Sequence, residues 1–283
     1  MSVALANLAG RAVVVRDGRA ADVEETSRGR FGTDPMALLA AWEAFVAWAA
    51  GLPDGAFGRG IDPARLGPPV PRPQKVLGIG VNYRAHAREA AMELPKQPMV
   101  FTKFPSCLVG PRADVALSSA TVDWEVELVV VMGRRARRVP AEQALGYIAG
   151  YCVGQDVSDR RLQFADKPPQ FSLGKSLDTF GPCGPALVTL DALRDPNDLA
   201  IRCDIDGTPM QDGRTSDMIF PVPELIAFLS TCLPLEAGDL IFTGTPAGVG
   251  STRTPRRYLQ AGEVVTSSIE GLGTLVNRCV TAR

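Results

Sequence analysis

Two glutamates stand two residues apart in a stretch that alternates as a β-strand does. Glu125 and Glu127 belong to the run from 121 to 131, and side chains two apart on a strand point the same way, so their carboxylates share one face. The opposite face is apolar and carries Val122, Trp124, Val126 and Leu128. Two carboxylates about 4 Å apart repel each other by roughly 4 kcal/mol at an effective dielectric of about 20. The pair therefore predicts either a solvated strand face or a bound cation.

A third carboxylate follows a second apolar stretch. Residues 149–158 are typical of a strand, and Asp156 lies at its end. Three converging carboxylates suit a hard divalent cation, Mg²⁺, Mn²⁺ or Ca²⁺, better than zinc. A Glu-x-Glu pair is also common on a strand with one face in water, so the acids alone leave both interpretations open.

The chain contains a single histidine, His86, which follows a strand predicted at 76–81. The alanine-rich stretch 85–92 favours a helix, and Glu89 lies three residues further on the same helical face. A carboxylate that holds one imidazole nitrogen fixes the tautomer and raises the basicity of the ring, as a water-activating dyad requires. The alternative is a solvated His-Glu pair on the surface of a helix.

These residues resemble the signature segments of the fumarylacetoacetate hydrolase superfamily, in that family's order, from about Lys75 to Cys279. The matching segments are 80–89, 100–103, 122–128, 150–151 with 156–163, 174–179 and 243–250. The resemblance implies metal ligation by Glu125, Glu127 and Asp156, with Mg²⁺ or Mn²⁺ as the cofactor and Ca²⁺ as an alternative occupant in a crystal. It implies catalytic roles for His86, Glu89 and Lys175. Substrate contacts are implied for Arg160, Gln163, Thr245 and, by a weaker correspondence, Lys103.

The sequence departs from the family pattern next to the third acid. Gln155 replaces the usual asparagine before the metal aspartate, and Ser158-Asp-Arg-Arg161 replaces the usual Ser-Ala-Arg-Asp. An additional acid and an additional base therefore stand beside the expected site. These changes put the identity of the substrate in doubt, but not the metal.

Charge suggests what the site binds. Three carboxylates and one divalent ion leave a net negative charge, which Arg160 and Lys175 would reverse if they are not simply solvated surface residues. An arginine fork and a lysine point charge suit a 2-oxo acid. We therefore expect a metal-dependent hydrolase that cleaves the C3–C4 bond of a 2,4-dioxo acid of the acylpyruvate or fumarylpyruvate type, in the catabolism of aromatic or related compounds. His86 and Glu89 would activate the attacking water.

Other interpretations share these features. The resemblance also covers 2-oxo acid decarboxylases, and hydratases or isomerases that use the same metal-enolate core. A non-catalytic metal-binding paralogue is a further alternative. Only hydrolysis strictly needs an activated water, so the dyad favours the hydrolase.

The composition excludes several classes of partner. The 283 residues include 30 Lys and Arg and 31 Asp and Glu, so a net charge of -1 predicts neither nucleic-acid nor membrane binding. No two of the six cysteines lie closer than 20 residues, so there is no Cys-x-x-Cys motif, and reduced thiols predict a cytoplasmic protein. The expected partner is a small 2-oxo or 2,4-dioxo acid, and the family resemblance implies a homodimer.

The chain divides into two expected domains, residues 1–70 and 71–283. The first contains short strands that turn at Asp17-Gly18, a helix from Asp34-Pro35 to Gly51, and a proline-rich linker that begins at Pro68. The second is mostly short strands, with an Asp206-Gly207 hairpin and short helices near 140–147 and 223–231. We predict an α+β fold that is mostly β. The resemblance implies a mixed β-sandwich roll after a small N-terminal α/β domain.

A glycine-rich loop at 243–250 invites comparison with nucleotide-binding motifs, but it lacks the Walker lysine. Gly78-Ile-Gly80 likewise lacks the third glycine of a dinucleotide fingerprint. The loop is better interpreted as a tight turn that brings backbone and the Thr245 hydroxyl close to a small anion, or as turn geometry alone.

Overall fold

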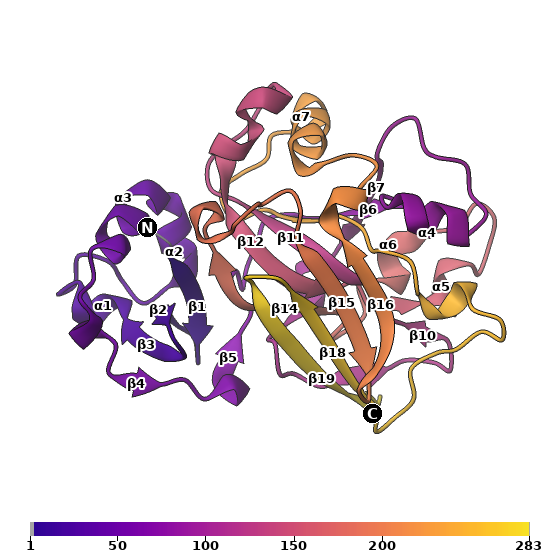
Figure 1. The fold of residues 1–283 in the computed structure, drawn as a ribbon, viewed down its shortest axis with the longest axis horizontal. Coiled ribbons are helices and arrows are strands. Elements are labelled where there is room, and N and C mark those ends of the chain that lie inside the picture. The colour runs from indigo at the N-terminus through magenta and orange to yellow at the C-terminus, as the bar shows by residue number, and fades with distance from the viewer. Residues whose placement is uncertain (1–2, 283) are drawn as a thin grey trace.

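The computed structural model describes residues 3–282, which form a mixed α+β fold that is mostly strand. Figure 1 shows the N-terminal strands and helices on one side and the strands of larger sheets stacked in the middle. Short runs of β-branched and aromatic residues bounded by turns favour strands over long helices. The predicted fold class is confirmed.

Within the described residues the largest sheet has 12 strands. Its strands in spatial order are β4 (Arg59–Gly60), β3 (Arg19–Asp22), β2 (Arg11–Arg16), β1 (Ala4–Leu8), β14 (Gly181–Val188), β12 (Ile148–Gln155), β11 (Val126–Met132), β17 (Leu240–Phe242), β6 (Val76–Gly80) and β7 (Met99–Lys103), with β5 (Leu66–Gly67) beside β1 and β8 (Leu108–Val109) beside β14. Most neighbours are antiparallel, whereas β17 runs parallel to β6 and β8 parallel to β14. The sheet is therefore mixed.

A five-stranded sheet covers part of one face of the large sheet. Its strands are β16 (Thr208–Arg214), β15 (Ala200–Ile205), β18 (Val264–Ile269), β19 (Gly273–Thr281) and β9 (Val115–Leu117). Contacts of β15 with β11, of β18 with β12 and of β19 with β14 stack the two sheets. A third sheet has two strands, β10 (Val122–Asp123) and β13 (Ser158–Asp159), and lies at the edge of this sandwich.

Both faces of the central strand β11 are buried. Leu128 and Val130 lie in the core between the two sheets, and Val129 and Val131 lie in a second core that includes the N-terminal helices. The odd-numbered face also carries Glu127, which is 1% exposed. A solvated strand face, the alternative considered for the two glutamates, is therefore wrong.

The predicted strand at 121–131 is also interrupted. β10 ends at Asp123 and β11 begins at Val126, because the chain passes there from one sheet to another. Two amide side chains replace the missing strand partners: Gln155 Oε1 accepts from the Glu125 N–H at 2.9 Å, and Gln211 Oε1 accepts from the Val126 N–H at 3.0 Å. Both N–H groups thus remain hydrogen-bonded in a buried position.

The helices are short. They are α1 (Val23–Thr26), α2 (Pro35–Ala40), α3 (Trp42–Ala50), α4 (Arg84–Glu89), α5 (Arg160–Gln163), α6 (Phe171–Gly174) and α7 (Val222–Cys232), with 3₁₀ turns that include η4 (Ala141–Tyr147) and η7 (Gly250–Thr252). The helices expected near 140–147 and 223–231 correspond to η4 and α7. Figure 1 shows α4, α5 and α6 together at the end of the molecule opposite α2 and α3.

The N-terminal region follows the expected pattern with one correction. The turn between β2 and β3 has positive φ angles at Asp17 and Gly18, 49° and 72°, and Asp34 caps α2 through the Met36 N–H. The single helix predicted to end at Gly51 is instead two, because Ala41 leaves the helical region between α2 and α3. β1 pairs with β14, so the large sheet continues across the expected boundary near residue 70.

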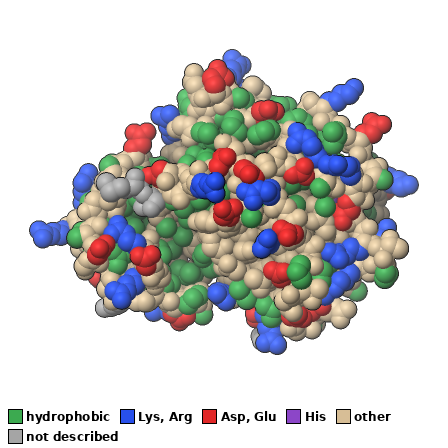
Figure 2. All heavy atoms as spheres, in the orientation of Figure 1, with side chains coloured by type: hydrophobic (Ala, Val, Ile, Leu, Met, Phe, Trp, Pro, Cys, Tyr) green, Lys and Arg blue, Asp and Glu red, His purple; other side chains and the backbone are tan. Residues whose placement is uncertain are grey.

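Charged side chains of both signs lie on the face drawn in Figure 2. Figure 2 shows basic and acidic side chains interspersed on this face, without a basic stripe. Among residues 3–282, no helix is both long and apolar enough to cross a bilayer.

Candidate metal and catalytic site

The three predicted acids meet beside β11 and β12, at the point where the chain passes from β10 to β11. Each of Glu125, Glu127 and Asp156 offers an oxygen within 4.8 Å of the others, and all three are buried. Register explains the convergence, because Glu127 pairs with Gly154 across the β11–β12 ladder and Asp156 directly follows β12. The Asp156 N–H also donates to the Glu125 carbonyl at 2.9 Å, which holds the two acids side by side.

The protein provides cationic partners for Glu125 but none for Glu127 among the described residues. Glu125 accepts from Arg160 at 2.6 Å and from Lys175 at 2.7 Å. Burial acts to raise the pKa of Glu125, but Lys175 and Arg160 bring this pKa below its ordinary value. Glu127 has no cationic partner within the described residues, and its one hydrogen bond comes from the Gly244 N–H at 2.8 Å.

Burial, together with the charges of Asp156 and Glu125, raises the pKa of Glu127 well above its ordinary value. The charge of Lys175 opposes this rise only in part, so the buried Glu127 carboxylate is costly to ionise beside the other two unless a further cation binds. The donor set is three hard oxygens, which Mg²⁺ and Mn²⁺ prefer. The residues present therefore fit a divalent metal ion, which Glu125, Glu127 and Asp156 would hold.

Two lysines hold Glu125 and Asp156 from the protein side. The Lys175 ammonium donates to Glu125 at 2.7 Å, to Asp156 at 2.6 Å and to the Ser158 hydroxyl at 2.7 Å. Burial acts to lower the pKa of Lys175, but Asp156 and Glu125 raise it, so the lysine stays charged. Lys103 donates to the second oxygen of Asp156 at 2.8 Å and to the carbonyls of Lys175 and Phe180.

The position of Lys103 differs from its expected substrate contact. Its three ammonium protons are all taken within the protein, the side chain is fully buried, and it does not line the cavity in front of the acids. We therefore assign to Lys103 the role of holding Asp156 in place.

Arg160, the first residue of α5, makes its contacts within the protein. Its guanidinium donates to Asp123 at 2.8 Å, to Glu125 at 2.6 Å and to the Gln163 side-chain oxygen at 2.8 Å. Burial opposes its charge, yet Glu125 and Asp123 raise the pKa of Arg160 above its ordinary value. The helix starts here because Asp159, one of the departures from the family pattern, caps it through the Arg161 N–H at 3.0 Å.

Asp123 is a residue that the sequence analysis missed. Its carboxylate accepts from the Gly250 N–H at 2.7 Å, from the Ser251 N–H at 2.9 Å and from Arg160. It thereby joins α5 to η7. The available signal was its position two residues before Glu125, on the same face of the predicted strand.

The helical spacing of the dyad brings its two side chains together. His86 Nδ1 lies 3.3 Å from Glu89 Oε2, and the Gly248 N–H donates to the Glu89 carboxylate at 3.0 Å. Burial acts to raise the pKa of Glu89, but the hydrogen bonds from His86 and Gly248 lower it, so an anionic carboxylate orients the imidazole. The helix itself is α4, which ends at Glu89, three residues earlier than expected.

The glycine-rich loop 243–250 serves these same carboxylates. Gly244 and Gly248 have positive φ angles, 97° and 107°, and a Cβ atom on Gly248 would stand 2.0 Å from the Met210 carbonyl oxygen. Their N–H groups bind Glu127 and Glu89, respectively. The Thr245 hydroxyl donates to the Val126 carbonyl at 2.8 Å and accepts from Gln211 at 2.8 Å. The anions that the loop contacts are therefore side chains of the site.

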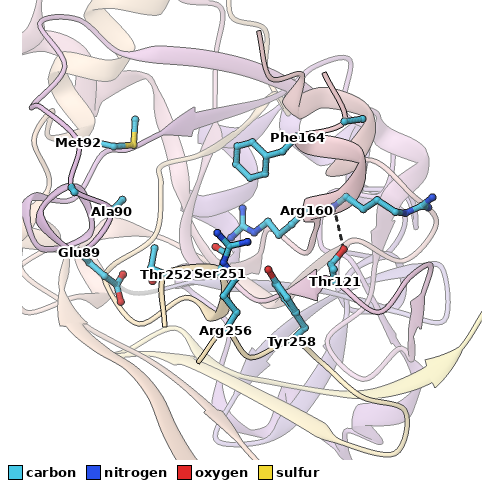
Figure 3. A pocket seen from close by; sticks show the side chains of 13 residues that line it. Glu89, Ala90, Met92, Thr121, Arg160, Phe164, Ser251, Thr252, Arg256 and Tyr258 are labelled. Atoms are coloured by element: carbon cyan, nitrogen blue, oxygen red, sulfur yellow. Dashed lines mark hydrogen bonds between the residues drawn. The ribbon is translucent and has the colours of Figure 1, made fainter. Parts of the chain in front are cut away.

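A cavity of about 490 Å³ brings Glu125 and Glu127 of the triad together with His86 of the dyad, and neither Asp156 nor Glu89 is among the residues that line it. The predicted site residues that line it are His86, Glu125, Glu127, Arg160, Gln163, Lys175 and Thr245. A second and larger cavity lies beside it, and Figure 3 shows Glu89, Arg160, Phe164, Arg256 and Tyr258 on its walls. The arrangement places an oriented base and a hard-metal site on one enclosed space, which suits proton transfer next to a polarised oxo group.

Comparison with known proteins agrees with this geometry. Residues 75–280 match the family described as fumarylacetoacetate (FAA) hydrolase C-terminal. The mitochondrial oxaloacetate tautomerase FAHD2A of Bos taurus is 45% identical over 214 residues, which are 75% of this chain and 68% of that protein. The crystal structure of a candidate HpcE protein from Mycobacterium smegmatis is 45% identical, with a TM-score of 0.92 and 100% of both chains covered.

A more distant structure contains ligands. The maleylpyruvate hydrolase from Sphingobium sp. SYK-6, crystallised with manganese(II) and pyruvate, is 28% identical, has a TM-score of 0.82 and covers 99% of this chain and 100% of that chain. The family match spans both the acids and the dyad, and the structural matches span the whole fold. The chain belongs to the fumarylacetoacetate hydrolase superfamily of enzymes.

Proposed function

We propose that the protein is a metal-dependent hydrolase that cleaves the C3–C4 bond of 2,4-dioxo acids. The observation that carries the proposal is a single cavity lined by Glu125 and Glu127 of the acid triad and by His86, whose imidazole lies next to the Glu89 carboxylate. A base beside a metal site is the arrangement that hydrolysis of a 1,3-dicarbonyl unit needs.

The residues would divide the reaction between them. A bound divalent cation would polarise the 2-oxo group of the substrate. His86 would take a proton from water, and the resulting hydroxide adds to the C4 carbonyl. The C3–C4 bond then breaks, and its electron pair passes to C3 as the enolate of pyruvate. The proton that His86 took from water would pass to C3, which gives pyruvate and a carboxylic acid and returns His86 to its neutral form. The Lys175 ammonium supplies positive charge on the cavity wall while the enolate forms.

A second candidate is tautomerisation of a 2-oxo diacid. The relative that favours it is the oxaloacetate tautomerase, at 45% identity. Its chemistry would use His86 to move a proton at C3 instead of activating water. The two candidates share the enolate, so the metal ligands do not distinguish them. The fate of the carbon chain does.

The test is product analysis. Protein loaded with Mg²⁺ or Mn²⁺ would be incubated with acetylpyruvate, a fumarylpyruvate-type acid and the enol form of oxaloacetate, and the products followed by NMR. The proposal expects stoichiometric release of pyruvate and a second acid from at least one dioxo acid. Conversion of enol to keto oxaloacetate without cleavage of any dioxo acid would replace it with the tautomerase.

Inhibition gives a separate check. Oxalate is a compact mimic of the pyruvate enolate, so it should compete with the substrate at the triad. The substitution Glu127→Gln should remove oxalate binding together with metal binding. Insensitivity of the loaded enzyme to millimolar oxalate would count against binding of the 2-oxo acid at the triad.

A further inference from the structure

The helix that carries the dyad is capped by a distant segment. α4 follows Tyr83, whose side chain makes no hydrogen bond to the first turn of the helix. The first N–H groups of a helix need acceptors from outside it. Asp217, the last residue of η6 (Thr215–Asp217), provides one, because its carboxylate accepts from the Ala85 N–H at 2.9 Å. The Arg84 guanidinium also donates to the carbonyls of Asp217 and of the residue that follows it.

The residue two positions before α4 is held by the same segment. The side chain of Asn82 is fully buried and accepts from the Phe220 N–H at 2.9 Å. It donates to the carbonyls of Phe220 at 3.1 Å and of Thr243 at 2.7 Å. The Ile219 N–H donates to the Asn82 carbonyl at 2.7 Å. Residues 217–220 therefore bind the chain on both sides of the start of α4.

The chain enters this arrangement through an unfavourable backbone conformation. Val81 has a φ angle of 51°, which is rare for a β-branched residue. Such a conformation persists only where the surrounding contacts enforce it. The hydrogen bonds of the neighbouring Asn82 provide that constraint. The direction in which the chain leaves β6 and begins α4 is thus set by contacts with residues 217–220.

β16 and the segment after it contact both halves of the site. The Gln211 side chain, in β16, binds the Val126 N–H and the Thr245 hydroxyl beside the acid triad. Asp217, shortly after this strand, binds the helix of the dyad. Asp217 is not among the residues that line the inner cavity, so it can affect the chemistry there only through the position of α4.

We propose that Asp217 is a positioning residue, whose hydrogen bond to the first turn of α4 sets the place of the His86 imidazole relative to the acid triad. The inference rests on the proposed function only in taking His86 as the base. A misplacement of about 1 Å in a reacting group can lower a rate by about 10²-fold. Arg160 and Lys175 lie on other elements, so the loss of Asp217 should affect turnover more than substrate binding.

Steady-state kinetics on the Mn²⁺-loaded protein test this role. Asp217→Ala should lower kcat by about tenfold or more, with KM within about twofold of the wild type. Asp217→Asn keeps an oxygen that can accept from the Ala85 N–H, so it should retain most of the wild-type kcat. Asp212→Ala is the matched control and should behave as the wild type, because it removes an acid of β16 whose ion pair with Arg202 lies on the surface.

A chemical readout needs no turnover. The chain has one histidine, so modification by diethyl pyrocarbonate, followed by mass spectrometry of the peptide that contains it, reports on His86 alone. The His86 side chain is 13% exposed in the folded protein. Asp217→Ala should raise the rate of its modification by about fivefold or more, the factor expected for the loss of a helix cap. Asp217→Asn should leave this rate near that of the wild type.

A second variant keeps the test informative if Asp217→Ala does not fold. Arg84→Met changes an exposed side chain, removes two of the contacts to residues 217–220 and should produce the same two effects by smaller factors. An unchanged kcat or an unchanged rate of His86 modification in folded Asp217→Ala would overturn the proposal. Equal losses of kcat in Asp217→Ala and Asp212→Ala would overturn it as well.

The two proposals fail separately. A protein that cleaves no dioxo acid, but whose His86 becomes more reactive in Asp217→Ala and not in Asp217→Asn, would refute the hydrolase and keep the positioning role. Release of pyruvate from dioxo acids at the same rate by the wild type and by Asp217→Ala would do the reverse.

Discussion

The three acids of the triad differ in how the protein balances their charge. Glu125 and Asp156 each accept hydrogen bonds from buried cations, whereas Glu127 accepts only a backbone N–H. Buried cations keep the pKa of Glu125 below its ordinary value, whereas burial raises the pKa of Glu127 well above its ordinary value. The ion pairs hold Glu125 and Asp156 in position, and the negative charge that remains at Glu127 favours the binding of one divalent ion.

Replacement of the uncompensated acid should separate metal binding from folding. Glu127→Gln removes a buried repulsion, so the metal-free variant should melt at a temperature equal to or above that of the wild type. Mn²⁺ at about 100 times its Kd should stabilise the wild type by about 2.7 kcal/mol and the variant not at all. Thermal unfolding with and without Mn²⁺ measures both effects.

The matched control is Glu142→Gln, which changes an exposed glutamate in η4 and should respond to Mn²⁺ as the wild type does. An undiminished Mn²⁺ shift in Glu127→Gln would show that the ion does not bind at the triad.

Residue chemistry was the most predictable level. Glu125, Glu127 and Asp156 meet as expected, and so do His86 and Glu89. Helical spacing explains the His86–Glu89 contact, whereas Asp156 reaches the two glutamates through the pairing of β12 with β11. Asp123 has the same strand spacing, but its partners are the N–H groups of 250 and 251, more than a hundred residues away. No local pattern reports such contacts.

At the scale of elements, the crossing between β10 and β11 shapes the site. Glu125 lies in neither strand: its backbone N–H donates to the Gln155 side chain, and its carboxylate is held beside Asp156 by Lys175, which donates to both acids. Gln155, which replaces the family's usual asparagine, reaches that N–H and also donates to the Ser267 hydroxyl at 2.9 Å. It links the metal site to the second sheet.

Removal of that amide should weaken both fold and site. Gln155→Ala leaves the Glu125 N–H and the Ser267 hydroxyl without this partner in the core, and each unsatisfied buried group costs about 1–3 kcal/mol. Denaturant unfolding should show a loss in that range or above it, together with weaker Mn²⁺ binding. Gln143→Ala, in the exposed part of η4, controls for the loss of an amide. A stability equal to the wild type would contradict the bridging role.

Element boundaries were less predictable than element types. The alternation of polar and apolar residues predicts a strand through 121–131. The chain nevertheless leaves the strand at Trp124 and Glu125, because it changes sheets there. The sequence predicts one helix from Asp34-Pro35 to Gly51, yet Ala41 divides it into α2 and α3. Both breaks are set by packing against distant strands, which the local pattern does not contain.

At the scale of the whole molecule, the N-terminal region is part of the main sheet. β1 pairs with β14, and Leu5, Val14 and Phe45 share a core with Val129 and Phe242. The short polar turns Asp17-Gly18 and Asp206-Gly207 could be predicted from the sequence. The order of the strands within each sheet could not. Pairing between segments some 180 residues apart depends on the complete fold.

This shared core predicts cooperative unfolding. The full chain should melt in one transition, and a fragment of residues 71–283 should expose the apolar face of β11 and aggregate or bind a hydrophobic dye. Calorimetry and dye binding measure the two effects. A fragment that stays folded and monodisperse with unchanged metal binding would show that residues 1–70 form an independent domain. The homodimer stays a prediction, which light scattering would test.

The central claim, hydrolysis by water that His86 activates beside the acid triad, is tested most directly by the turnover of His86→Ala on a 2,4-dioxo acid. With Mn²⁺ binding verified to equal that of the wild type, we predict a loss of about 10²-fold to 10⁴-fold in pyruvate release, the range for removing a positioned general base. Release of pyruvate at close to the wild-type rate by the metal-loaded variant would contradict the account.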